Sequence, residues 1–156
     1  MESALEMHEA VMGRIAGQDL FVATAAVADY RVADPAPTKI KKGQAELTLR
    51  LVRNPDILAA VAALPDAPFT VGFAAETERV VEQALDKLRA KGLDMIAANR
   101  VGGPQGGFER EDNALTVIHR DGRVDPLALM PKARLAEALT DLIEEAYAAR
   151  SATQDS

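Results

Sequence analysis

Residues 25–42, AAVADYRVADPAPTKIKK, bring together residue types that suit a phosphorylated ligand. Small side chains come first, then the acid Asp29, and after a proline-containing run the cations Lys39, Lys41 and Lys42. A carboxylate can accept a hydrogen bond from a ligand hydroxyl or hold a metal that phosphates also bind. Lysines on a loop longer than about 12–15 residues can close over polyphosphate and neutralise its charge.

Each of these features also has a plainer interpretation. Asp29 is equally suited to capping a turn or a helix, and most lysine runs are simply solvated. The small residues over 23–28 allow a flat base to lie against the backbone, or equally permit close packing of a helix on a sheet. The residues alone leave these alternatives open.

Two further groups of residues are candidates for binding an anion. Asn54, Pro55 and Asp56 have the pattern of a helix start, with a capping side chain, a proline at the first helical position and an acid in the first turn. A helix N-terminus also binds anions, so both roles are compatible. Lys87 and Lys91 lie four residues apart on one helical face, where spacing alone favours an exposed stripe.

Several well-known catalytic and nucleotide-binding patterns are missing from the sequence. The run GGPQGGF (102–108) contains neither Gly-Lys-Ser/Thr nor a G-x-G-x-x-G before a helix, so it is a weak candidate for a phosphate loop. His8 and His119 are isolated, and we assign neither a role. Because there are no cysteines, we expect no disulfide, no thiolate nucleophile and no cysteine-bound metal.

Composition restricts the class of protein. The 156 residues are 48% hydrophobic and 27% charged, which is typical of a globular domain with its own core. A net charge of −6 and an aromatic content of 4% disfavour nucleic-acid binding. No apolar run reaches the ~20 residues of a membrane helix, and the acidic N-terminus does not resemble a signal peptide. We therefore expect a cytoplasmic protein with one domain over residues 1–150 and a polar, frayed tail over 151–156.

The elements that position the candidate residues alternate between helix and strand. Capping residues followed by apolar positions at helical spacing predict helices from Ser3 to Gly17, at 55–64, at 78–91 with Val81, Ala84, Leu85 and Leu88 inward, and from Pro131 onward. Continuous apolar runs predict buried parallel strands at 20–26, 69–75 and 93–99. Strict alternation predicts a half-exposed strand at 46–52, and Asp121-Gly122 predicts a hairpin between 113–120 and a short strand near Val124. Residues 27–45 show no periodicity and are expected to form a loop.

Buried strands alternating with amphipathic helices indicate an α/β fold. We predict a Rossmann-like three-layer fold with a mainly parallel sheet, followed by a C-terminal β-hairpin and helix. In such a sheet the ligand binds beyond the C-terminal ends of the strands. These ends lie at Ala25-Ala26, Phe73-Ala74 and Asn99, so the sequence predicts a site there for a phosphorylated ligand such as a nucleotide.

Six short motifs occur in an order that resembles one enzyme family. They are AAVADYR, KIKK beginning ten residues after Asp29, NPDIL, VGFAAET, KL..KGLDMIAAN and F....NALTVI. Together, over roughly residues 4 to 145, they resemble phosphopantothenoylcysteine synthetase, the ligase half of the bacterial bifunctional coenzyme A biosynthesis protein. The resemblance implies that CTP, with Mg²⁺, activates 4′-phosphopantothenate as an acyl-cytidylate that L-cysteine then attacks. It also implies a homodimer and a decarboxylase domain in the full-length protein.

The resemblance further implies a nucleotide site built from residues of this chain. Backbone groups of Ala23, Thr24 and Ala25 would face the nucleotide, and the carboxylate of Asp29 would bind it. Lys39 would close over the activated phosphate and is the one catalytic side chain that the resemblance carries over. The other implied nucleotide contacts are Pro55, Asp56, Ile57, Leu58, Phe73, Lys87 and Lys91.

The chain also departs from the family pattern. No part of it resembles the family's N-terminal β-α unit, whose TNxSSG-like glycine-rich loop includes a catalytic asparagine, and Asn99 does not match that motif. We therefore expect a C-terminal portion of a synthetase that binds nucleotide weakly and is inactive by itself. The alternatives are a binding or dimerising fragment without ligase activity, and an unrelated nucleotide-binding domain such as an oxidoreductase, which the missing G-x-G-x-x-G disfavours. The sequence does not decide between CTP and ATP.

Overall fold

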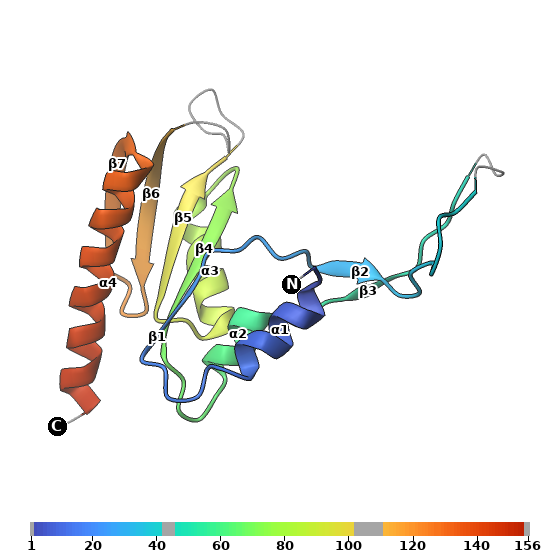
Figure 1. Cartoon of the computed structure of the whole chain (residues 1–156). Coiled ribbons are helices and arrows are strands. Elements are labelled where there is room, and N and C mark those ends of the chain that lie inside the picture. Colours follow the sequence, from blue (N-terminus) through green and yellow to red (C-terminus); the bar gives the residue numbers. More distant parts are fainter. Residues whose placement is uncertain (1, 42–45, 102–110, 155–156) are drawn as a thin grey trace.

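The computed structural model of the chain describes residues 2–41, 46–101 and 111–154. Its centre is a mixed five-stranded sheet with the strand order β1-β4-β5-β6-β7 (Figure 1). The first three of these strands run parallel, and the last two complete the sheet as an antiparallel hairpin. The strands are β1 (Leu20–Ala23), β4 (Phe69–Glu76), β5 (Met95–Arg100), β6 (Asp112–His119) and β7 (Val124–Pro131).

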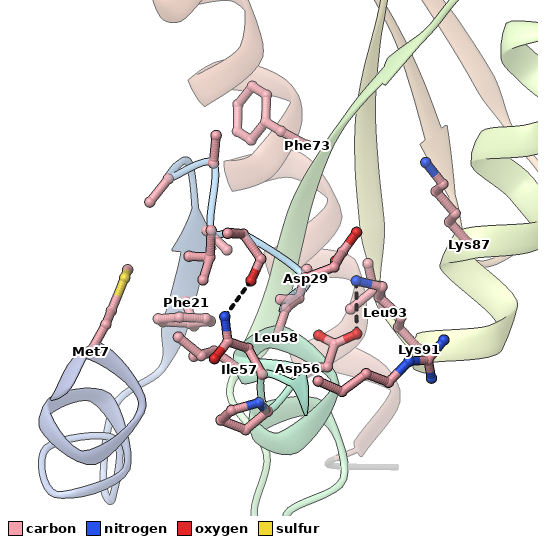
Figure 2. Close-up of a pocket in the computed structure, with 18 of the residues that line it drawn as sticks. Met7, Phe21, Asp29, Asp56, Ile57, Leu58, Phe73, Lys87, Lys91 and Leu93 are labelled. Carbon is pink, nitrogen blue, oxygen red and sulfur yellow. Dashed lines mark hydrogen bonds and ion pairs between the residues drawn. The ribbon is translucent and has the colours of Figure 1, made fainter. Parts of the chain in front are cut away.

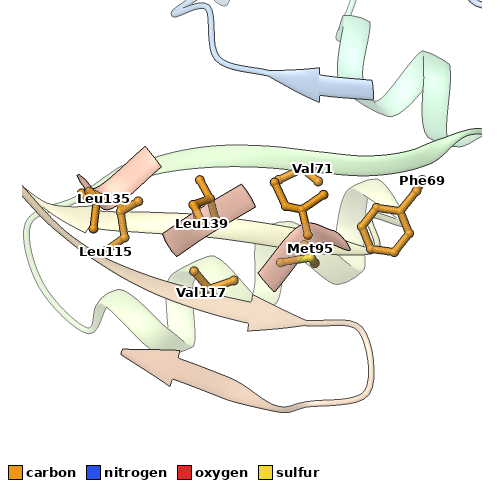
Figure 3. Packing of buried hydrophobic residues seen from close by; sticks show 9 residues of the cluster. Phe69, Val71, Met95, Leu115, Val117, Leu135 and Leu139 are labelled. Carbon is orange, nitrogen blue, oxygen red and sulfur yellow. The ribbon is translucent and has the colours of Figure 1, made fainter. Parts of the chain in front are cut away.

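Helices cover both faces of this sheet, which confirms the predicted α/β fold with its C-terminal hairpin and helix. The helices are α1 (Ala4–Met12), α2 (Ile57–Ala62), α3 (Val80–Lys91) and α4 (Lys132–Gln154). On one face, Leu135, Leu139 and Ile143 of α4 pack against buried residues of β4, β5 and β6 (Figure 3). On the other face, Ala84 and Leu88 of α3 are buried in a second core cluster together with residues of β4, β5 and β6.

The capping prediction for α1 is confirmed, whereas its predicted end is wrong. The N–H of Glu6 donates to Ser3 Oγ at 3.2 Å, so Ser3 is the N-cap. The helix ends at Met12 with Gly13 as its C-cap, four residues before the predicted stop at Gly17. Gly17 instead has a φ of +72° and turns the chain toward β1, a conformation that glycine adopts without strain.

The predicted strand at 20–26 pairs in parallel but is neither as long nor as buried as expected. It ends at Ala23 and lies at the edge of the described sheet, paired with β4 alone. Leu20 is 43% exposed as a result. A continuous apolar run does not reveal how many neighbours its strand will have, which explains the error.

The segment predicted to be a loop contains a strand. Within 27–45, β2 (Tyr30–Val32) pairs antiparallel with β3 (Leu51–Arg53). This pair and the chain beyond it, residues 30–41 and 46–53 as described, project from the body of the molecule and are called the arm below (Figure 1). Regular strand structure within the predicted strand 46–52 is confined to its end. Residues 42–45, with Lys42, and the glycine-rich run 102–108 lie outside the described residues.

The start of α2 differs from the prediction in its capping residue. Asp56, rather than Asn54, is the N-cap, and its Oδ1 accepts from the N–H of Ala59 at 3.0 Å. Asn54 instead fixes the base of the arm, because its Nδ2 donates to the carbonyl of Ala28 at 2.7 Å. Its Oδ1 also accepts from Arg31 at 3.2 Å.

Helix α3 was predicted closely. Gly92 follows its last residue with a φ of +69°, as expected of a residue that ends a helix. Ala84 and Leu88 are buried and Leu85 packs against them, but Val81 is 43% exposed, so its predicted inward position is wrong. Val80, one position earlier, packs against the core instead.

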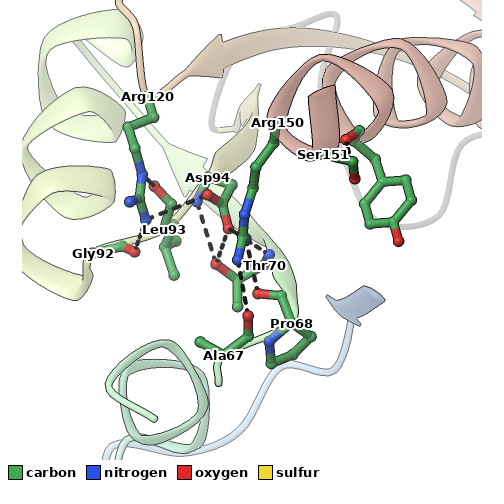
Figure 4. A network of polar contacts seen from close by, with 10 residues as sticks. Ala67, Pro68, Thr70, Gly92, Leu93, Asp94, Arg120, Arg150 and Ser151 are labelled. Carbon is green, nitrogen blue, oxygen red and sulfur yellow. Dashed lines mark hydrogen bonds and ion pairs between the residues drawn. The ribbon is translucent and has the colours of Figure 1, made fainter. Parts of the chain in front are cut away.

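A buried polar network joins the C-terminal part of α4 to the N-terminal ends of β4 and β5 (Figure 4). The carboxylate of Asp94 accepts from the N–H of Thr70 at 2.8 Å and from its Oγ1 at 3.0 Å. Arg150 donates to Asp94 at 2.8 Å and also to the carbonyls of Ala67 and Pro68. Helix α4 continues beyond this contact to Gln154, four residues into the segment expected to be a polar tail. None of the helices within the described ranges is long and apolar enough to cross a membrane.

Candidate functional site

A cavity of about 580 Å³ opens beyond the C-terminal ends of β1 and β4, on the face of the sheet that α2 and α3 cover (Figure 2). We call it the main cavity. The sequence predicts a ligand beyond the C-terminal ends of the parallel strands, and the main cavity lies there. The segment after β1, the start of α2 and one face of α3 form its walls.

Most of the residues predicted to contact nucleotide line this cavity together. They are Ala23, Ala25, Asp29, Pro55, Asp56, Ile57, Leu58, Phe73, Lys87 and Lys91. The residues come from four separate segments of the chain, so the fold is what brings them into one place. That they bind nucleotide stays a prediction.

Two predicted site residues lie elsewhere. Thr24 lines a second hollow, on the α4 side of the sheet. Lys39 is exposed on the arm and is not among the residues that line either hollow. For Lys39 to reach a ligand in the main cavity, the arm would have to approach that cavity.

Both lysines of α3 pair with carboxylates at the cavity wall. They are therefore not simply solvated lysines on an exposed helical face. Lys87 Nζ donates to Glu76 Oε1 at 2.6 Å, and Lys91 Nζ lies 2.9 Å from Asp56 Oδ2. The side chain of Glu76 is only 7% exposed, whereas that of Lys87 is 49% exposed. An anionic ligand would therefore meet two cations whose ammonium groups are already positioned.

Glu76 was not among the site residues predicted from the sequence. The available signal was its place directly at the end of an apolar strand, which is the same kind of position as that of Asp29. A charged side chain that terminates such a strand sits at the edge where α/β proteins bind ligands.

Asp56 both caps α2 and pairs with a cavity lysine. Burial disfavours its charged form and raises the pKa, but the hydrogen bonds from Lys91 and from the N–H of Ala59 outweigh burial. The pKa of Asp56 therefore lies below its ordinary value, and the carboxylate is ionised at neutral pH. Any ligand phosphate would share Lys91 with this carboxylate.

The side chain of Asp29 does not have the capping role that was the alternative interpretation of this residue. It caps none of the described helices, and among the described residues its carboxylate makes no hydrogen bond. The phenol of Tyr30 and the charge of Asp29 together raise the pKa of nearby Arg53. Asp29 is thus an available anionic acceptor on the wall of the main cavity.

The described residues provide no cluster of three or more carboxylate, histidine or cysteine side chains for a metal. Magnesium in nucleotide sites is commonly held by one or two carboxylates together with substrate phosphates. A single free carboxylate such as Asp29 fits that mode of binding. The geometry therefore suits a ligand that carries both hydroxyls and phosphates, with or without its own metal ion.

Comparison with sequence families adds an independent result. The profile of the family described as "DFP: DNA/pantothenate metabolism flavoprotein C-terminal domain" matches residues 1–147. The coenzyme A biosynthesis bifunctional protein CoaBC of Vibrio cholerae is 49% identical over 148 residues, which are 93% of this chain and 37% of that protein. The protein of the same name from Escherichia coli K12 is 48% identical over 149 residues, 36% of its length. The chain thus spans little more than a third of these relatives.

Solved structures agree with the sequence comparison. The crystal structure of the C-terminal domain of CoaBC superposes with a TM-score of 0.74 at 34% identity, covering 93% of this chain and 63% of that one. The DNA/pantothenate metabolism flavoprotein from Streptococcus pneumoniae has a TM-score of 0.75 at 16% identity, over 93% of this chain and 71% of that one, which shows a shared fold.

Proposed function

The chain belongs to the family of DNA/pantothenate metabolism flavoprotein C-terminal domains, and from this premise we propose that its main cavity binds the nucleotide of a ligation in coenzyme A biosynthesis. The proposed reaction is the CTP-dependent joining of 4′-phosphopantothenate to L-cysteine through an acyl-cytidylate. One observation carries the proposal: Asp29, the start of α2 and the two α3 lysines meet in a single cavity at the strand ends.

The proposed chemistry needs no nucleophile from the protein. A carboxylate oxygen of the acid attacks the α-phosphorus of CTP, the bond to the bridging oxygen breaks, and pyrophosphate leaves. The amine of cysteine then attacks the acyl carbon, the acyl–phosphate bond breaks, CMP leaves, and the nitrogen releases its proton to water. A chain without cysteine, with both of its histidines outside the main cavity, is compatible with this route.

The residues of this chain would act by binding and charge stabilisation. Asp29 would accept hydrogen bonds from nucleotide hydroxyls or hold Mg²⁺, which would neutralise phosphate charge when bound. Lys87 and Lys91 would donate to the polar edges or phosphates of the nucleotide. The small side chains of Ala23 and Ala25 would let the nucleotide approach the backbone closely.

Lys39 has a separate part in the proposal. It would supply positive charge to the transferring phosphate once the arm moves toward the main cavity. Replacing Lys39 by Ala in an active synthetase that carries this sequence should lower kcat more than nucleotide affinity. Unchanged turnover would leave Lys39 an ordinary solvated lysine.

We also propose a homodimer formed through the arm. The arm exposes four large apolar side chains that contact no core, namely Ile40, Leu47, Leu49 and Leu51, which are 53% to 60% exposed. Apolar side chains gathered on a projecting arm favour pairing with a second copy. The three leucines do not pack on α2 within one chain, since they are exposed.

Calorimetric titration of the chain with CTP tests the nucleotide site. We expect binding by the wild-type chain and at least tenfold weaker binding by Asp29→Ala, because a charge-assisted hydrogen bond contributes about 1.5–3 kcal/mol. Asp34→Ala is a matched control, since Asp34 is an exposed acid on the arm that does not line the main cavity. Equal affinities of wild type and Asp29→Ala would contradict the site. Pyrophosphate release by a longer synthetase containing this sequence tests the reaction itself.

A further inference from the structure

The main cavity is also lined by Arg53, a cation that has no part in the proposed function. Arg53 is the last residue of β3, where the arm returns to the body of the molecule, and its side chain is exposed. The two α3 lysines are each paired with a carboxylate, whereas Arg53 forms no ion pair with a carboxylate among the described residues. Arg53 is therefore a cation at this cavity whose charge the described fold does not neutralise.

The side chain of Arg53 is supported by Tyr30. The two residues are directly opposite each other in the pair of β2 and β3, and the guanidinium carbon of Arg53 lies 6.0 Å from the centre of the Tyr30 ring. A guanidinium is attracted to the face of an aromatic ring, and this attraction restricts where the side chain points. Because a guanidinium carries five N–H donors, contact with one ring leaves donors for the oxygens of a phosphate.

Backbone pairing holds Arg53 close to Asp29. The N–H of Asn54, the next residue in the chain, donates to the carbonyl of Asp29 at 2.8 Å. The phenol of Tyr30 raises the pKa of Arg53 and the charge of Asp29 raises it further, so the guanidinium lies within reach of that charge. The two side chains nevertheless form no ion pair with each other. A carboxylate and a guanidinium thus lie near each other on the cavity wall, and both are available to a ligand.

These two side chains suit two neighbouring parts of a nucleotide. Ribose hydroxyls donate to a carboxylate, and phosphate oxygens accept from a guanidinium. The α-phosphate is attached to the 5′ carbon of the same ribose, so it lies nearer to the ribose hydroxyls than the β- and γ-phosphates do. From this juxtaposition we propose that Arg53 binds the α-phosphate of the nucleotide. The inference rests on the proposed function, which places nucleotide hydroxyls at Asp29.

The α-phosphate is the group at which the proposed reaction takes place. As a carboxylate oxygen of the acid bonds to the α-phosphorus, the bond to the bridging oxygen breaks and pyrophosphate leaves with the electron pair of that bond. Arg53 forms no covalent bond in this step, because its N–H groups only donate to the nonbridging oxygens of the phosphorus under attack. Arg53 already lies at the cavity, whereas Lys39 has to be brought there by the arm.

Titration of the chain of 156 residues with cytidine, CMP and CTP shows which part of the nucleotide Arg53 contacts. Cytidine has no phosphate, and CMP carries the α-phosphate alone. NMR titration to millimolar concentration, which follows backbone amide signals at the main cavity, measures the three affinities. We expect Arg53→Gln to weaken the binding of CMP and CTP about tenfold or more, since a charge-assisted hydrogen bond is lost, and that of cytidine less than about twofold.

Two further variants separate charge from packing. Arg50→Gln removes an exposed arginine of the arm that pairs with Asp34 and does not line the main cavity, so it should change none of the three affinities. Arg53→Lys keeps the positive charge and should bind CMP more tightly than Arg53→Gln does. Equal affinities of these two variants for CMP would show that only packing on Tyr30 matters, and would overturn the proposal.

The same titrations of Asp29→Ala separate this inference from the proposed nucleotide site. Asp29→Ala should weaken the binding of all three ligands, and if it weakens none of them the nucleotide site itself is wrong. If Asp29→Ala weakens all three but Arg53→Gln weakens none, or weakens cytidine as much as CMP, the site stands and the role of Arg53 is overturned. A loss for CTP with CMP unchanged would place Arg53 at the β- or γ-phosphate and would also overturn the assignment to the α-phosphate.

Discussion

At the scale of single residues, the main cavity is organised by pairs of opposite charge. Glu76 pairs with Lys87 and Asp56 pairs with Lys91, so each of the two α3 lysines at the cavity has its own carboxylate. Buried carboxylates cost free energy unless they are paired, and pairing also fixes where the ammonium group lies. The same side chains therefore contribute both to the stability of the fold and to the proposed binding of nucleotide, and experiments must separate the two effects.

For Lys87, a double substitution separates the effect on stability from the effect on nucleotide binding. Lys87→Ala should weaken CTP binding at least tenfold and lower the free energy of unfolding by about 1–3 kcal/mol, because it leaves Glu76 buried without its partner. Adding Glu76→Gln should restore most of the stability but not the affinity. Urea unfolding and calorimetric titration with CTP measure the two effects, and Arg89→Ala, exposed on the same helix, is the control. Restored affinity in the double variant would show that Lys87 acts only through the fold.

The lowered pKa of Asp56 predicts a stability difference that depends on pH. A carboxylate whose pKa is depressed in the folded state stabilises that state above its unfolded pKa, and the effect disappears as pH falls through the folded pKa. Asp56→Asn keeps a capping oxygen but loses the ion pair with Lys91, so we expect it to be less stable by about 0.5–1 kcal/mol at neutral pH. The difference from wild type should shrink as the pH falls through the lowered pKa of Asp56 and vanish once this carboxylate is protonated in the folded state. Urea unfolding at several pH values measures it, and a difference that stays constant with pH would contradict this cause.

At the scale of elements, what the sequence predicted well depended on local pattern alone. The strands β4 and β5 and the helix α3 follow from apolar runs and helical spacing. The pairing of β2 with β3 does not, because it joins segments about twenty residues apart, and the segment that forms β2 shows no periodicity in the sequence. The cap of α2 was misassigned for a related reason: Asn54 and Asp56 both suit that role, and only the contact of Asn54 with Ala28 decides between them.

At the candidate site too, local sequence patterns predicted which residues lie at strand ends but not the contacts between distant segments. Strand ends and the resemblance named most of the residues that line the main cavity, since parallel strands end at one edge. The position of Lys39 on the arm depends on the long-range pairing of β2 with β3, so spacing in the sequence did not reveal it. The pairing of Lys87 with Glu76 likewise depends on how α3 lies across β4.

The arm makes a prediction about assembly at the same scale. Wild-type chain should have twice its own mass of 16.6 kDa at micromolar concentration, and Leu49→Glu should return it to the monomer, because a buried leucine contributes about 1.5–3 kcal/mol. Thr48→Glu adds the same charge at the neighbouring position, which carries no large apolar side chain, and should leave the dimer intact. Light scattering after gel filtration measures the mass. A wild-type chain that is monomeric at these concentrations would refute the arm as an interface.

At the scale of the whole molecule, the question is how much of a synthetase residues 1–156 contain. These residues form two cavities, one on each face of the sheet near the C-terminal strand ends. Asp29 and the two α3 lysines line the main cavity. The matched CoaBC C-terminal domain is longer, since this chain covers 63% of it. The sequence of residues 1–156 contains no TNxSSG-like loop, so these residues offer few backbone donors for a triphosphate.

We therefore expect residues 1–156 alone to bind CTP weakly and to catalyse nothing. Each charge-assisted hydrogen bond to phosphate contributes about 1.5–3 kcal/mol, so two or three fewer donors weaken binding about a hundredfold or more relative to a longer synthetase. The net charge of −6 acts in the same direction, because a negatively charged protein repels a triphosphate. Calorimetry with CTP, run beside a pyrophosphate assay with the acid, cysteine and Mg²⁺, measures both quantities. Sustained turnover by these residues would show that the catalytic groups lie within them, and a CTP affinity equal to that of the longer protein would show that the lysines and Asp29 suffice for the triphosphate.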